Sequence, residues 1–139
     1  MTNDAAELSR RIDVVESSYE FLLAYAAQGR QDDRGSEARA RLTALHDALE
    51  GLATLATKVL DARPQAALDV VPFLDALAAD ARAARGAVAL VLRKPAIPSL
   101  LVDNLNASVH VRALLTDVFL VEQSLREPVQ IQLTGSTAK

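Results

Sequence analysis

The chain has 139 residues, a formal net charge of −3 and no cysteine, and half of its residues are apolar while only 4% are aromatic. This length is enough for one domain whose core needs no metal or disulfide. The missing cysteines exclude a disulfide framework, a thiolate nucleophile and Cys-type zinc or iron–sulfur sites. The lack of a long basic run argues against a nucleic-acid partner.

Localisation is also predicted from composition. The N-terminus shows no signal-peptide pattern, and the most apolar stretch, residues 100–121, carries charged side chains that a membrane span would not tolerate. A chain without cysteine is compatible with a reducing compartment. We therefore expect a cytoplasmic protein with no membrane span.

Apolar residues recur at alternating spacings of four and three in four parts of the chain. This spacing places each set on one stripe of an α-helix, because 3.6 residues per turn bring such positions onto the same face. The stripes are Leu8, Ile12, Val15, Tyr19, Leu22 and Ala26; Ala38, Leu42, Leu45, Leu49, Leu52, Ala56 and Val59; Val70, Leu74, Leu77, Ala81, Ala84, Val88 and Val91; and Ala107, Val111, Leu114, Val118, Val121 and Leu125. The pattern predicts four helices that bury these stripes.

Capping residues and glycine bound the first two predicted helices. The first begins at Asp4, whose side chain can accept from free backbone N–H groups, and ends before Gly29, which can adopt the left-handed conformation. A polar loop follows at 29–35. Ser36 then caps a second helix that continues to about residue 61.

Prolines bound the third predicted helix. It starts near Pro72, after a kink or a short turn, continues through Gly86 and ends before Pro95. A buried strand at 87–92 is the alternative for its last part. We favour the helix because the apolar stripe continues to Val91.

The last predicted helix runs from Ser99 to a point before Pro128. Beyond it, apolar residues alternate with glutamines at 129–133, a period-two pattern typical of a short edge strand or an extended arm. Short links between long helices favour antiparallel neighbours. We therefore predict an all-α fold, an antiparallel up-down-up-down four-helix bundle over residues 1–127 with an extended C-terminal arm at 128–139.

The last helix is more apolar than a bundle requires. Between residues 100 and 121, fourteen of twenty-two positions are apolar, against about three in seven for a bundle helix. The excess predicts self-association as a homodimer, and hence a non-enzymatic scaffold or adaptor that binds protein partners. The predicted interface residues are Phe21, Tyr25, Val109, Leu114, Val118, Phe119 and Val121.

Two alternatives use other residues. A small-molecule-binding bundle or an enzyme would have an apolar pocket beside the last helix, with His110, Tyr19 and Tyr25 as polar anchors. A basic concentration is either an anion or docking patch or an ordinary solvated face, and it comprises Arg82, Arg85, Arg93 and Lys94. For the favoured interpretation we predict no catalytic residue, no cofactor and no metal.

Histidine phosphotransfer is a further alternative, centred on His46. Phosphotransfer modules usually place a lysine and a glycine shortly after the histidine, whereas this chain has Leu49 and Glu50 there. A carboxylate one turn away would repel the phosphoryl group. The acids Asp13 and Glu16, with Glu20, are the other candidate for chemistry, as metal ligands or as a solvated face.

A short segment also resembles a known family. Leu8, Arg11, Ile12 and Asp13 resemble the opening of the bacterial helical chorismate mutases, over about ten residues. The resemblance implies an all-α dimer with arginine and lysine around a dicarboxylate substrate. Where that family has an essential arginine this chain has Ala26, so the substrate would lose its bidentate partner. We transfer no active site from it.

Overall fold

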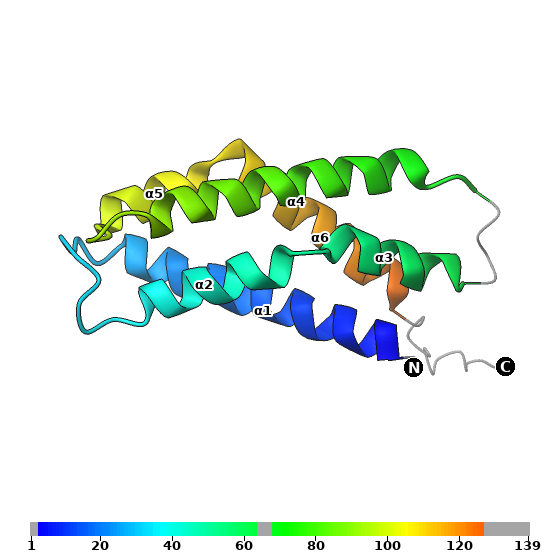
Figure 1. Cartoon of the computed structure of the whole chain (residues 1–139), viewed down its shortest axis with the longest axis horizontal. Coiled ribbons are helices and arrows are strands. Elements are labelled where there is room, and N and C mark those ends of the chain that lie inside the picture. Colours follow the sequence, from blue (N-terminus) through cyan, green and yellow to red (C-terminus); the bar gives the residue numbers. More distant parts are fainter. Residues whose placement is uncertain (1–2, 64–67, 127–139) are drawn as a thin grey trace, which may run out of the picture.

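The computed structural model describes residues 3–63 and 68–126, and every regular element within these ranges is a helix (Figure 1). The helices are α1 Asn3–Ala26, α2 Ala38–Leu49, α3 Leu52–Asp61, α4 Val71–Leu92, α5 Ser99–Ala107 and α6 Val109–Leu125. The all-α prediction is confirmed, and the alternative of a strand at 87–92 is wrong because these residues lie in α4. No helix in the described ranges combines the length and the apolar character needed to cross a membrane. The predicted arm at 128–139 lies outside the described residues.

The two long helices α1 and α4 organise the packing. Each of them contacts all four shorter helices, α2, α3, α5 and α6. In Figure 1, α2 and α3 follow one another along one side of the molecule. The predicted stripe at 38–59 is buried at every position, and the stripe at 70–91 at every position except Val70. Burial of these apolar side chains is the main stabilising contribution to the fold.

The second predicted helix is divided at Gly51. This residue has a φ of 69°, in the left-handed region that side chains with a Cβ rarely adopt. α2 therefore ends at Leu49, and α3 begins at Leu52. Both leucines stay buried, so the break removes neither of them from the core.

The fourth predicted helix is divided at Ser108, and the spacing of its buried residues explains why. Val102 is buried in α5 and Val111, nine residues later, in α6; the same spacing separates the buried Leu105 from the buried Leu114. Nine residues are about two and a half turns, so on one continuous helix each pair would point to opposite faces. The Oγ of Ser108 accepts a hydrogen bond at the start of α6 and so caps the new helix. The prediction of four unbroken helices is therefore wrong for the described residues, which form six.

The third predicted helix is continuous. α4 begins at Val71 with Pro72 in its first turn, where the missing N–H of proline costs nothing. This confirms the short turn before the helix rather than a kink within it. The helix also continues through Gly86 without a break.

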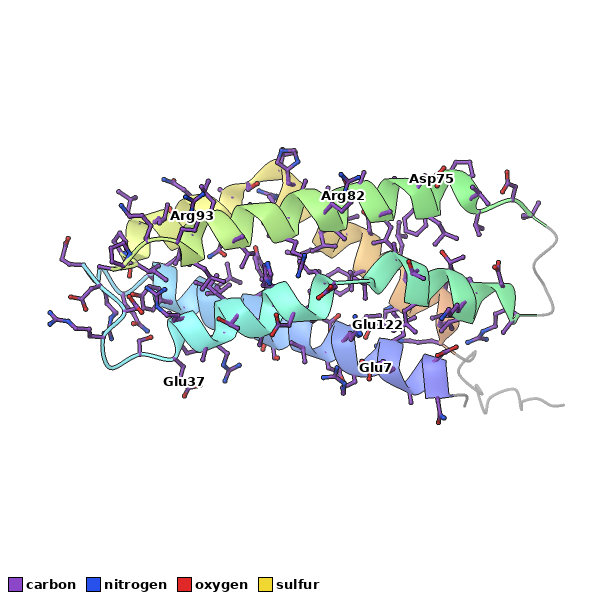
Figure 2. All side chains as sticks on the ribbon, viewed as in Figure 1. Glu7, Glu37, Asp75, Arg82, Arg93 and Glu122 are labelled. Atoms are coloured by element: carbon purple, nitrogen blue, oxygen red, sulfur yellow. The ribbon has the colours of Figure 1, made fainter. Side chains whose placement is uncertain are left out.

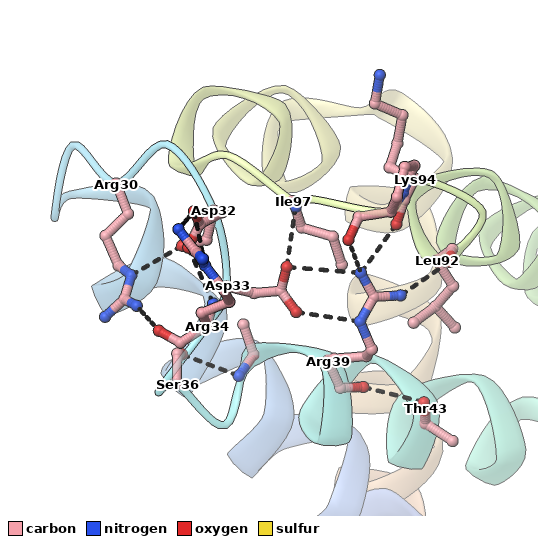
Figure 3. Close-up of polar contacts among 12 residues, drawn as sticks. Arg30, Asp32, Asp33, Arg34, Ser36, Arg39, Thr43, Leu92, Lys94 and Ile97 are labelled. Carbon is pink, nitrogen blue, oxygen red and sulfur yellow. Dashed lines mark hydrogen bonds and ion pairs between the residues drawn. The ribbon is translucent and has the colours of Figure 1, made fainter.

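A guanidinium ties the two loops at one end of the molecule together (Figure 3). Arg39, at the start of α2, donates to the backbone carbonyls of Leu92 and Lys94 at 3.0 and 2.8 Å. Its Nε also lies 3.0 Å from the carboxylate of Asp33, which accepts from the backbone N–H of Ile97 at 3.0 Å. The guanidinium beside it lowers the pKa of the Asp33 carboxyl. The loop after α1 and the link after α4 are thereby fixed to each other.

Side chains of α5 donate to carbonyl groups near the end of α1. The last four carbonyls of a helix, which here include that of Tyr25 but not that of Leu22, have no i+4 partner in their own helix. Ser99 Oγ donates to the carbonyl of Tyr25 at 2.7 Å, and Asn106 Nδ2 donates to that of Leu22 at 3.1 Å. In return, the Tyr25 hydroxyl donates to the carbonyl of Ile97 at 2.6 Å. These bonds hold α5 against α1.

Gly51, at the break between α2 and α3, and Gly86, inside α4, allow a matched test of the division between α2 and α3. An added Cβ meets no atom within 4 Å at either site. Gly51→Ala should lower the free energy of unfolding by about 1 kcal/mol, because alanine is strained at a positive φ. Gly86→Ala should raise it by about 0.5–1 kcal/mol, because alanine favours a helix interior. Urea denaturation followed by circular dichroism measures both, and shifts of the same sign would contradict the left-handed break.

Candidate functional site

Part of the apolar excess of the last predicted helix lies on the surface. Val109, Phe119 and Leu120 are 70%, 54% and 56% exposed. Val109 follows Val102 by about two turns and Leu120 follows it by about five, so both continue the line of the buried stripe of α5. Because the helix is broken at Ser108, the positions of α6 on this line face solvent, whereas those of α5 face the core. We call this surface the outer face of α6. It consists of Val109, Ala113, Thr116, Phe119 and Leu120, and the exposed Arg112 and Gln123 lie among them on the same side of the helix.

The predicted interface residues fall into two groups. Val109 and Phe119 are exposed on the outer face of α6, and Phe21 is partly buried with the Arg41 guanidinium 5.1 Å from its ring centre. The other four are buried in the protein's own core, namely Tyr25, Leu114, Val118 and Val121. In this fold those four offer no surface to a partner. Leu120, which the sequence analysis did not select, does.

The basic residues are spread along α4 rather than gathered. Arg82 lies in the middle of the helix and Arg93 just after its end (Figure 2), eleven residues further on and therefore about 16 Å along the axis. Arg85 is engaged by the carboxylate of Glu50 at 3.3 Å. Lys94 is exposed in the link that follows. Arg82 and Arg93 thus present separate charges, and a docking role for them stays a prediction.

The histidines and tyrosines do not meet at one site. Tyr25 is buried with its hydroxyl bonded, Tyr19 is partly buried on α1, and His110 is exposed on α6. His46 is partly buried, and its Nδ1 lies 3.5 Å from the carboxylate of Asp47. A phosphoryl group on His46 would meet this carboxylate, which would repel it.

A groove opens where α1, α3 and α6 come together at one end. It has a volume of about 700 Å³, which is in the range of small-molecule sites. Its apolar walls are Ala5, Leu8, Ile12, Val59, Ala62 and Leu125, and its polar lining includes Arg63, Glu122 and Arg126. A cavity beside the last predicted helix therefore exists, but none of the predicted anchors His110, Tyr19 and Tyr25 lines it.

Carboxyl groups of α1 and α6 meet near this groove. Asp13 and Glu16 lie with Glu122 so that one oxygen from each is within 4.8 Å of the other two. Carboxylates this close to one another repel when all of them are ionised. Burial and the neighbouring Glu122 and Asp13 raise the pKa of Glu16 to about 6, while Arg126 acts in the opposite direction. The sequence analysis grouped Asp13 and Glu16 with Glu20, because residue spacing carries no sign of a partner on another helix.

A second carboxyl pair joins α6 to α4. Burial and the adjacent Asp80 raise the pKa of Asp117 to about 7, and no basic side chain in the described part of the chain offsets them. The Oδ2 of Asp117 is buried and has no donor beside it while both carboxyls are ionised. The Asp80 carboxyl becomes its hydrogen-bond partner when the pair holds a proton. The pair is therefore favourable in its protonated form and repulsive when fully ionised.

The sequence analysis missed Asp80, Asp117 and Glu122, although a weak signal exists. Asp80 follows the buried Leu77 by three residues, and Asp117 follows the buried Leu114 by three. An acid at such a spacing stands at the edge of a buried stripe. Which acids face one another across two helices depends on the packing, which the spacing does not specify.

Comparison with known proteins adds no relative. The chain matches no protein-family model, no curated protein and no solved structure. The candidate sites on this chain are the outer face of α6, the groove and the two carboxyl pairs.

The Asp117 pair gives a prediction with a definite sign. Because the folded-state pKa is raised from 3.8 to about 7, the folded protein keeps a proton that the unfolded chain loses, so stability falls as pH rises through this window. Asp117→Asn should raise the free energy of unfolding by about 1–3 kcal/mol near pH 8 and change it little near pH 4. Denaturant titrations at the two pH values measure this, with Asp75→Asn, exposed on α4, as the control. An equal gain at both pH values would contradict the assignment.

Proposed function

We propose that this protein is a non-enzymatic interaction protein, a cytoplasmic scaffold or adaptor, that forms a homodimer through the outer face of α6. The observation that carries the proposal is the exposure of Val109, Phe119 and Leu120 on one face of one helix. Exposed apolar side chains gathered on one face mark interaction sites more often than scattered ones do. The interface is therefore smaller than the sequence alone suggested, because Leu114 and Val118 belong to the core.

The spacing of this face fits a second copy of the same chain. Val109 and Leu120 are eleven residues apart, about 16 Å along the helix axis. If two α6 helices pack antiparallel about a two-fold axis, Val109 of one copy meets Phe119 and Leu120 of the other. Ala113 and Thr116 then lie near the crossing, with the exposed Arg112 of each copy beside them. A two-fold dimer is also the commonest closed assembly.

The size of the face determines the expected affinity. A stable dimer buries about 800 Å² on each partner, more than three partly exposed side chains supply. Burial contributes roughly 25 cal/mol per Å², from which the entropy of association is subtracted. We therefore expect a weak dimer whose population depends on protein concentration.

We also propose that the six described helices form the four columns of a bundle. In this arrangement, α1 and α4 are two columns of an up-down-up-down bundle, and α2 with α3 and α5 with α6 are the two divided columns. The contacts of both long helices with all four short ones support this arrangement. The outer face of α6 would then lie on the exterior of the last column.

Sedimentation equilibrium over a range of concentrations tests the dimer. Phe119→Glu should weaken association at least tenfold, because a charge would be buried against the second copy. Leu90→Glu, at an exposed position on α4, is the matched control and should leave association unchanged. A wild-type protein that stays monomeric up to about 1 mM, or equal effects of the two substitutions, would overturn the proposal.

The groove favours small-molecule binding as a second candidate function. Its apolar walls and volume are those of a ligand site. An anilinonaphthalene sulfonate dye should fluoresce on binding there, and Ala62→Trp, which fills the groove, should reduce that signal while Phe119→Glu leaves it intact. Loss of the signal in Phe119→Glu alone would place the dye on the outer face of α6 and remove the support for a ligand site in the groove.

A further inference from the structure

We propose that α6 is a proton-sensitive element: the carboxyl pairs that join it to α1 and α4 seat it firmly only while each pair holds a proton, and proton loss loosens α6 and weakens pairing through its outer face. The second half of this inference rests on the proposed homodimer, whose regulation it supplies. The first half concerns the seating of α6 within one protomer and stands independently of the dimer.

The placement of the acids on α6 carries the argument. Asp117 and Glu122 are five residues apart, which separates them by about 140° around the helix axis. The buried residues Val118 and Val121 lie between these two directions. One acid therefore faces Asp80 of α4 and the other faces α1, at the two edges of the buried stripe. The outer face lies on the opposite side of the helix.

Few charges act on the α4 pair. Asp80 of α4 is the charged group that faces Asp117, and among the described residues neither α1 nor α5 adds another. Ionisation of both acids would thus place two uncompensated negative charges side by side at a partly buried contact. Such a contact is strained, because like charges in a low-dielectric setting repel more strongly than in water.

The α1 pair is partly compensated. Glu16 is faced by Glu122 and Arg126, both from the C-terminal part of the chain, and by Asp13 of its own helix. The single guanidinium offsets one of three carboxylates. The raised pKa values of Glu16, about 6, and Asp117, about 7, place the loss of both protons near neutral pH. A modest change in pH therefore alters the charge on both edges of α6.

Hydrogen exchange measured by mass spectrometry tests the seating of α6 directly. After correction for the intrinsic pH dependence of exchange, the protection of residues 109–125 should fall at least tenfold between about pH 5.5 and pH 8.5, and by at least as much as that of residues 38–49 in α2, whose exchange reports the loss of global stability. The double substitution Glu16→Gln with Asp117→Asn should abolish this fall. Asp75→Asn, labelled on α4 in Figure 2, should not affect it. Unchanged α6 protection in the wild type, or a fall that the double variant retains, would overturn the inference.

Sedimentation at the same two pH values tests the regulation. The wild-type dimer should dissociate more readily at the higher pH, and the double variant should not. A dimer whose affinity is independent of pH, despite looser α6 amides, would overturn the regulatory half. A wild type that is monomeric at both pH values would overturn the proposed homodimer and the regulatory half with it, and the exchange data would still decide whether protons seat α6.

Discussion

The half-turn offset between the buried residues of α5 and those of α6 determines the architecture of this part of the molecule. Val102 and Val111 must both reach the core, and nine residues of unbroken helix would place them on opposite faces. The chain resolves this by ending one helix at Ala107 and capping the next at Ser108. The same break leaves Val109 and Leu120 outside the core, so the proposed interface is a consequence of the packing.

Different kinds of polar contact hold α5 and α6, the two helices that replace the single predicted last helix. α5 is fastened by neutral hydrogen bonds from Ser99 and Asn106 to the end of α1. α6 is flanked by acids, and its partners Glu16 and Asp80 are acids as well. Neutral bonds do not depend on pH in the physiological range, whereas paired carboxyls do. The two helices should therefore respond differently to the same change in pH.

The acids also have opposite effects on stability. Asp33 has a lowered pKa because of Arg39, so its contribution is present above the ordinary range of aspartate and is lost as pH falls through its folded-state pKa. Asp117 has a raised pKa, so its contribution is lost as pH rises from about 4 to about 7. Low pH thus weakens the contact of Asp33 with Arg39 between the two loops, and high pH weakens the contact of α6 with α4 at Asp117 and Asp80.

The sequence predicted the core well where local spacing decides burial. The stripe at 38–59 is buried throughout, although a left-handed Gly51 divides its helix. The prediction of one long last helix was wrong because the excess of apolar residues was taken as surface, whereas the nine-residue offset between two stripes is the signature of a break. Ser18 and Tyr25 show what local spacing does not predict, because both are polar side chains that are buried. The Tyr25 hydroxyl donates to a carbonyl 72 residues away, a contact that depends on the packing of the helices.

Single-cysteine labelling measures the central claim most directly, because the natural chain has no cysteine to interfere. In separate variants Val102→Cys, Val109→Cys and Val111→Cys, maleimide reaction at a protein concentration too low for dimers reports the exposure of each site. The break at Ser108 predicts fast reaction at 109 and slow reaction at 102 and 111. A continuous helix would place 102 and 109 on one face and 111 on the other, so equal rates at 102 and 109 with a different rate at 111 would contradict the account.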